Sequence, residues 1–178
     1  MNKLYYPRKI LKHIRPFIKT DDILVIHGAR QTGKTTLLKM IIQELPTNDI
    51  SYFDLEDSRL LDICNEGAES IINHLLQSGV LKKQSRIYLF IDEIQYLDNP
   101  SSLLKIVHDH YKNLKLIISS SSSFALKSKF KDTLVGRTVN FELYPLDFEE
   151  FLLFKEKTTD IKNLITSTAL LNELKLLF

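Results

Sequence analysis

The chain has 178 residues, with 24 Lys and Arg against 22 Asp and Glu, so its formal net charge is only +2. This length predicts one domain with a small appendage, and a hydrophobic fraction of 44% excludes a mainly disordered chain. No apolar run approaches the ~20 residues of a membrane span. The single cysteine, Cys64, can form neither an internal disulfide nor a cysteine-based zinc site. We therefore expect a cytoplasmic protein without membrane association.

The N-terminal segment is rich in basic residues. Pro7 can open a helix that runs to about Ile18, unless Pro16 kinks or ends it. Its apolar positions are expected to dock on the core, and its basic positions either meet phosphates or form a solvated face. These basic positions all precede the first acid, Asp21: Lys3, Arg8, Lys9, Lys12, Arg15 and Lys19. We expect residues 1–20 to form a basic helix packed on the core.

The rest of the chain alternates strand-like apolar runs with helical segments. Short apolar runs predict strands at 23–26, 50–55, 87–91, 114–118 and 139–143. Helical spacing predicts helices at 34–45, at 57–76 with a break near Gly67, from 99 or 101 onward, and around 148–154. This order predicts an α/β fold, a three-layer α/β/α sandwich with a mainly parallel five-stranded sheet, whose ligands bind at the carboxyl ends of the strands. We expect this domain to span 21–157 and a separate helical region to begin at 158–178.

The strongest motif is Gly28-Ala29-Arg30-Gln31-Thr32-Gly33-Lys34-Thr35, which matches G-x-x-x-x-G-K-S/T at every fixed position. It lies between a predicted strand and a predicted helix, which is the context that this motif requires. Glycines let such a loop turn its backbone N–H groups toward phosphate oxygens, and the helix dipole favours the same anion. We therefore expect the loop from Gly28 to Thr36 to bind a nucleoside triphosphate. Lys34 would neutralise the β- and γ-phosphates, and the Thr35 hydroxyl would ligate Mg²⁺.

A second motif, Asp92-Glu93, ends the apolar run at 87–91. An isolated acid pair at a strand end more often caps the next helix. Downstream of a phosphate loop, at the end of a buried strand, it predicts an Mg²⁺-binding Asp92 and a Glu93 that activates or orients the attacking water. Gln95 either orders that water or caps the following helix.

These residues resemble the additional-strand P-loop ATPases and, within them, the AAA+-like group. More narrowly, they resemble a bacterial and archaeal ATPase family with the pattern Gly-x-Arg-Gln-x-Gly-Lys-Thr-x-Leu-Leu followed by Ile-Asp-Glu-Ile-Gln. This chain has both patterns, at 28–38 and at 91–95. A Gly-Arg pair at 136–137 and a Pro-Leu-x-Phe-x-Glu-Phe helix start at 145–151 also match. The resemblance covers residues 6–154 and implies an ATPase domain.

The resemblance also implies roles for two further residues. Family members end the fourth strand with Thr-Gly-Ser, and this chain has Ser119-Ser120-Ser121, so Ser119 keeps a hydroxyl that would sense the γ-phosphate. Arg137 would be an arginine finger for a neighbouring subunit or a sensor in its own chain, unless it is a surface arginine after a glycine turn. Family members continue into a winged-helix segment and a C-terminal domain, so we expect the chain to be an ATPase-domain fragment.

The expected function is ATP binding and Mg²⁺-dependent hydrolysis to ADP and phosphate, coupled to a conformational change of a C-terminal region or a partner. The expected catalytic residues are Lys34, Glu93, Arg137 and Ser119. One alternative is a nucleotide-gated scaffold on protein or DNA with little turnover. Another is a small-molecule kinase, which would need an arginine-bearing lid and an acceptor pocket; the stretch 127–137 could be mistaken for such a lid. A homo-oligomer or a protein partner is compatible with the apolar C-terminal end, whereas no base-reading motif supports DNA.

Overall fold

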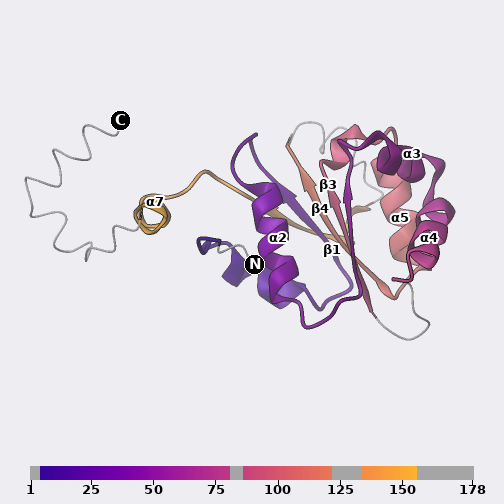
Figure 1. Cartoon of the computed structure of the whole chain (residues 1–178), viewed down its shortest axis with the longest axis horizontal. Helices are drawn as coiled ribbons and strands as arrows, with labels where there is room; N and C mark the ends of the chain where they lie inside the picture. Colours follow the sequence, from indigo (N-terminus) through magenta and orange to yellow (C-terminus); the bar gives the residue numbers. More distant parts are fainter. Residues whose placement is uncertain (1–4, 81–85, 122–133, 156–178) are drawn as a thin grey trace, which may run out of the picture. The chain divides into compact units, whose positions relative to one another are not determined.

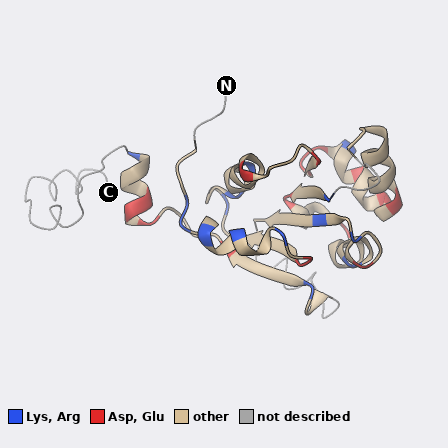
Figure 2. Ribbon diagram, turned by 90° about the horizontal axis from the view of Figure 1, so that it is seen from below, with Lys and Arg blue, Asp and Glu red and all other residues tan. Residues whose placement is uncertain are grey.

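The structure is a computed structural model that describes residues 5–80, 86–121 and 134–155. The chain divides into two compact units, Met1–Pro145 and Leu146–Phe178. Basic and acidic residues are interspersed along the described ribbon of the first unit (Figure 2). The first unit contains the sheet and both sequence motifs, so it is described first.

A five-stranded sheet forms the centre of the first unit. Its strands, in the spatial order β2-β3-β4-β1-β5, pair in parallel throughout. The bounds are β1 (Ile23–His27), β2 (Ile50–Asp54), β3 (Ile87–Asp92), β4 (Leu114–Ser120) and β5 (Thr138–Glu142). β3 and β4 are buried along their whole length, as expected of central strands covered on both faces. The expected α/β fold with a parallel five-stranded sheet is confirmed.

Helices cover both faces of this sheet (Figure 1). On one face, α2 (Lys34–Glu44), α1 (Leu11–Ile14) and the 3-10 turn η1 (Arg15–Phe17) enclose one apolar cluster with the inward side chains of the strands. On the other face, α3 (Ser58–Glu66), α4 (Ala68–Gln77) and α5 (Pro100–His110) enclose a second cluster, joined by the 3-10 turn η2 (Ile94–Tyr96). Alternation of side chains along each strand supplies both clusters. The result is three layers.

Proline and glycine set two helix boundaries. The N-terminal helix is shorter than expected, because α1 ends at Ile14 and Pro16 lies in the 3-10 turn η1. Leu11, Ile14 and Ile18 are nevertheless buried in the α2-side cluster. The expected break near Gly67 separates α3 from α4, where the glycine has a φ of 118°.

The second unit contains α7 (Phe148–Phe154). Asp147 and Glu150 form a capping box at its N-terminus, in which each side chain accepts a hydrogen bond from the other residue's backbone N–H. The helical region expected at 158–178 lies outside the described residues, so its boundary stays a prediction. Among the described residues, no helix is long and apolar enough to cross a membrane.

Candidate functional site

The loop between β1 and α2 is built around two glycines. Gly28 packs so closely against the chain after β5 that a Cβ atom there would lie 2.2 Å from the carbonyl oxygen of Leu143. Gly33 has a φ of 94° and directly precedes the first residue of α2. Glycine adopts this left-handed conformation without a steric penalty. Both glycines therefore serve the loop geometry, and the first N–H groups of α2, which have no acceptor within the helix, follow the loop directly.

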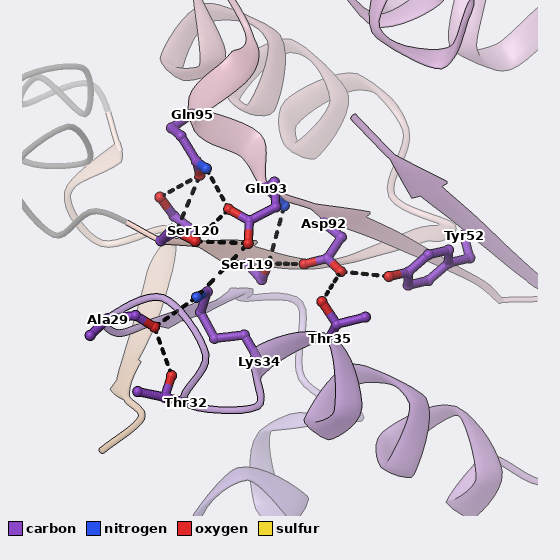
Figure 3. A network of polar contacts seen from close by, with 11 residues as sticks. Ala29, Thr32, Lys34, Thr35, Tyr52, Asp92, Glu93, Gln95, Ser119 and Ser120 are labelled. Atoms are coloured by element: carbon purple, nitrogen blue, oxygen red, sulfur yellow. Dashed lines mark hydrogen bonds and ion pairs between the residues drawn. The ribbon is translucent and has the colours of Figure 1, made fainter. Parts of the chain in front are cut away.

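Lys34 and Thr32 close the loop from within. The Lys34 ammonium donates a hydrogen bond to the carbonyl oxygen of Ala29 at 3.0 Å, and the Thr32 hydroxyl donates to the same oxygen at 2.9 Å (Figure 3). Lys34 is only 4% exposed. The remaining residues of the loop rim are exposed, namely Ala29, Arg30, Gln31 and Thr36. The loop between β1 and α2 thus has a buried cation at its base, and its outer residues are open to solvent.

A third element, the N-terminal segment, braces this loop from outside. The Arg8 guanidinium donates to the carbonyl oxygen of Thr32 at 2.9 Å and to that of Tyr144 at 2.7 Å. It therefore links the loop to the chain that follows β5. We did not predict this brace, because the residues it joins are 24 and 136 positions apart from Arg8.

Asp92 lies at the end of β3 and is only 1% exposed. Its Oδ2 accepts hydrogen bonds from the hydroxyls of Thr35 at 2.7 Å and Tyr52 at 2.6 Å. Its Oδ1 accepts a hydrogen bond from the Ser119 hydroxyl. The carboxylate is thus held by hydroxyls from α2, β2 and β4 (Figure 3). The structure brings Thr35, Asp92 and Ser119 together, and it adds Tyr52, which the sequence motifs did not single out.

Glu93 follows Asp92 with a φ of 56°, a conformation that non-glycine residues rarely adopt. Its backbone N–H donates to the Ser119 hydroxyl oxygen at 3.1 Å, and its carboxylate accepts from the Ser121 hydroxyl at 2.7 and 2.8 Å. The Gln95 side-chain amide also donates to this carboxylate. Lys34 Nζ lies 3.9 Å from Glu93 Oε1. Glu93 therefore faces the cation of the phosphate loop.

Gln95 connects Glu93 to the end of β4. Its amide oxygen accepts hydrogen bonds from the Ser120 hydroxyl at 2.8 Å and the Ser121 backbone N–H at 3.3 Å (Figure 3). β4 runs regularly through Ser119 and Ser120, so serine in place of the glycine expected from the resemblance leaves the strand intact. Gln95 contacts Glu93 itself, and Asn99 is the residue that caps the next helix, α5.

Arg137 lies at the amino-terminal ends of the strands, whereas the phosphate loop lies at their carboxyl ends. Its carbonyl oxygen accepts a hydrogen bond from the backbone N–H of Ile23, the first residue of β1, at 2.8 Å. The phosphate loop starts at Gly28, after the last residue of β1, and Gly28 is about 16 Å from Ile23 at about 3.3 Å per residue. The Arg137 guanidinium instead pairs with Asp109 at 2.9 and 3.1 Å and, together with His108, holds the pKa of that carboxyl well below its usual range. The structure does not bring Arg137 to the phosphate loop of its own chain.

The fold and this site together define the class of the protein. A parallel sheet with β4 inserted between β1 and β3, a phosphate loop after β1 and an acid pair after β3 make an AAA+-like P-loop ATPase domain. A family model for an AAA domain matches residues 20–152, and the chain belongs to this family. Family membership and the phosphate loop indicate nucleotide binding.

Three curated relatives extend beyond this chain. An uncharacterised protein of Methanocaldococcus jannaschii is 37% identical over 135 residues, which cover 76% of this chain and 29% of the relative. A second protein of that organism is 29% identical over 172 residues, covering 93% and 35%. One from Haemophilus influenzae is 29% identical over 147 residues, covering 80% and 36%. The chain therefore spans about a third of the length of these relatives.

Solved structures share the fold. The structure of C. elegans PCH-2 matches with a TM-score of 0.54 and 19% identity, over 87% of this chain and 44% of that chain. The structure of Drosophila ORC bound to AT-rich DNA and Cdc6 matches with a TM-score of 0.51 and 10% identity, over 90% and 62%. At these identities the likeness concerns the fold alone.

Proposed function

We propose that this domain binds ATP with Mg²⁺ and hydrolyses it to ADP and phosphate. The observation that carries the proposal is the 2.7 Å hydrogen bond between Thr35 and Asp92, beside a Lys34 ammonium that faces Glu93. Around one loop lie a hydroxyl and a carboxylate that would bind the metal, a cation that would bind phosphate and a candidate base. Together they supply the groups that phosphoryl transfer to water needs.

The oxygen ligands present fit Mg²⁺. Among the described residues, no group of three or more His, Cys, Asp or Glu side chains could hold a metal ion alone. Mg²⁺ characteristically takes one or two protein oxygens and completes its shell with waters and nucleotide phosphates. Thr35 and Asp92 would provide those protein oxygens. When bound, the ion would neutralise charge on the β- and γ-phosphates.

The chain's own residues have separate tasks in the proposed reaction. Lys34 would exchange its contact with the Ala29 carbonyl for the phosphate oxygens and stabilise their charge. Glu93 would accept a proton from the attacking water, whose oxygen bonds to the γ-phosphorus while the bond to the β,γ-bridging oxygen breaks. Ser121 and Gln95 orient the Glu93 carboxylate, which has lone pairs beyond those they occupy. Ser119 would act through Asp92 and the Glu93 backbone.

The test measures binding and turnover separately in the full chain. A fluorescent ATP analogue is titrated with and without Mg²⁺, and phosphate release is followed for the parent, Lys34→Ala and Glu93→Gln. We expect Lys34→Ala to abolish binding, and Glu93→Gln to bind nucleotide but lose turnover by at least about 100-fold. Lys39→Ala, an exposed position on the same helix, is the matched control. A folded parent without Mg²⁺-aided ATP binding would contradict the proposal.

The same experiment separates the alternatives. Unhydrolysed ATP retained for hours by the parent would indicate a nucleotide-gated scaffold, and phosphate transferred to an added small acceptor would indicate a kinase. Within the stretch 127–137, which could be mistaken for a kinase lid, residues 127–133 lie outside the described residues. We also propose that hydrolysis moves the C-terminal region or a partner. Limited proteolysis with ATP, ADP and no nucleotide tests this coupling, and sedimentation under the same conditions tests for a homo-oligomer.

A further inference from the structure

We propose that Tyr52 is a positioning residue for the magnesium site, holding the Asp92 carboxylate in the orientation that the metal needs. This inference rests on the proposed function. Tyr52 lies on β2, outside both sequence motifs, and its hydroxyl donates to Asp92 Oδ2 at 2.6 Å. The residue would act through Asp92 rather than on the nucleotide.

Sheet register explains how this tyrosine reaches the site. β2 pairs in parallel with β3, with Tyr52 opposite Phe90 and Asp54 opposite Asp92. Tyr52 therefore lies two residues before the position opposite Asp92. Its side chain packs against the α2-side apolar cluster. The long aromatic ring carries the hydroxyl forward along that face to the carboxylate, a reach that serine or threonine at this position would lack.

The hydrogen bond has a specific consequence because of the oxygen that it uses. Asp92 Oδ2 also accepts the Thr35 hydroxyl, so Tyr52 and Thr35 share one carboxylate oxygen. The Thr35 hydroxyl would also ligate Mg²⁺ through its oxygen. Tyr52 would have no such second role, so it would serve only to hold Asp92. Tyr52 on Oδ2 and Ser119 on Oδ1 together hold both oxygens of the Asp92 carboxylate.

Tyr52 is suited to orient Asp92 because its phenolic O–H is a hydrogen-bond donor that reaches Asp92 Oδ2 at 2.6 Å. Partners that orient a metal ligand in this way typically change metal affinity by about tenfold to a hundredfold when removed.

The test is Tyr52→Phe in the full chain, with Tyr88→Phe as the matched control. Tyr88 is buried in the same cluster but lies near the start of β3, at the other end of the strand from Asp92. A fluorescent ATP analogue is titrated with Mg²⁺ for each protein, and its metal-free affinity is measured separately. We expect Tyr52→Phe to need about tenfold more Mg²⁺ for half-maximal binding, with metal-free affinity unchanged. Tyr88→Phe should follow the parent.

The outcomes separate this inference from the proposed function. If the parent binds with Mg²⁺ and the Tyr52→Phe curve overlays it, the inference fails alone. If Tyr52→Phe weakens binding equally with and without Mg²⁺, the role is structural and the inference also fails. If the parent has no Mg²⁺ dependence, both fail.

A second readout keeps the hydroxyl in place. With 3-fluorotyrosine at position 52, the fluorine resonance should shift when Mg²⁺ is added to the ATP complex, and more than that of 3-fluorotyrosine at position 88. A resonance at position 52 that Mg²⁺ leaves unmoved overturns the proposal.

Discussion

Gly28 and Leu143 are in backbone contact: a Cβ atom on Gly28 would lie 2.2 Å from the Leu143 carbonyl oxygen. The Leu143 backbone N–H also donates to the carbonyl oxygen of His27 at 2.7 Å. The first residue of the phosphate loop is therefore pressed against the chain leaving β5. Because the obstacle is a backbone atom, a side-chain rotation cannot relieve it.

Gly28→Ala should therefore destabilise the fold and displace the loop. We expect the free energy of unfolding to fall by about 1–3 kcal/mol, as for other overpacked sites. ATP affinity should fall more than stability alone explains, since the loop must move to admit the methyl group. Urea denaturation and ATP titration check the two effects. Gly79→Ala, where nothing lies within 4 Å of the added Cβ but φ is +71°, controls for the loss of a glycine elsewhere. Unchanged ATP affinity in folded Gly28→Ala would contradict the prediction.

The fold and the centre of the site were predictable because local patterns specify them. The spacing of glycine and lysine marks the phosphate loop, and the apolar run before Asp92 marks a central strand. Because the strands are parallel, Thr35 and Asp92 had to meet at the carboxyl ends of the strands. Tyr52 was not predictable in this way. Its bond to Asp92 crosses 40 positions and depends on strand register and on the length of an aromatic side chain. The Gly-Arg pair and the family resemblance left Arg137 as a finger for a neighbouring subunit, a sensor in its own chain or a surface arginine, because neither specifies at which end of the strands it lies.

Arg8 offers a second test of loop geometry. Its guanidinium bridges the Thr32 and Tyr144 carbonyl oxygens, and a Cβ on Gly33 would lie 3.4 Å from its Nη1. Arg8→Gln should loosen the loop and lower ATP affinity about tenfold, the effect of losing one charge-assisted hydrogen bond of about 1.5 kcal/mol. Arg15→Gln, which removes an exposed pair with Glu44, is the control and should leave affinity unchanged. Equal affinities in Arg8→Gln and the parent would refute the bracing role.

Because of Lys115, we expect the free energy of unfolding to change with pH in the alkaline range. It is fully buried on β4, where its ammonium donates to the carbonyl oxygens of Thr20 and Asp22. Burial, and then the charge of Arg86, lowers the pKa of Lys115 from 10.5 to about 8, against the opposing effect of Asp22 and Asp21. Between these two pKa values the unfolded chain binds a proton that the folded chain has released.

Raising the pH from about 8 to 10 should therefore stabilise the parent relative to Lys115→Met, by up to about 1.4 kcal/mol per pH unit from this group. Urea denaturation of both proteins at pH 7, 8, 9 and 10 measures the difference. Below pH 8 both states carry the charge, so the difference should be constant there. A difference that stays constant from pH 7 to 10 would show that Lys115 titrates normally.

Arg137 raises a question about assembly, because it lies at the amino-terminal ends of the strands, away from the phosphate loop of its own chain. If it acts as an arginine finger, it must do so on a neighbouring subunit. Arg137→Ala should then bind ATP normally and lose turnover by about 10³-fold, the lower range for such residues. Its pair with Asp109 is partly exposed, so the loss of that pair should have little effect on stability.

Complementation decides between this role and a structural one. Arg137→Ala and Glu93→Gln should each be inactive alone, whereas a mixture should recover part of the turnover. In mixed assemblies, an intact Glu93 of one subunit meets an intact Arg137 of another. Asp109→Asn removes the carboxylate that pairs with Arg137 and leaves the positive charge of Arg137 in place. This variant should retain turnover. A mixture as inactive as its components, at concentrations where the parent self-associates, would exclude the finger and leave Arg137 as a surface ion pair between α5 and the start of β5.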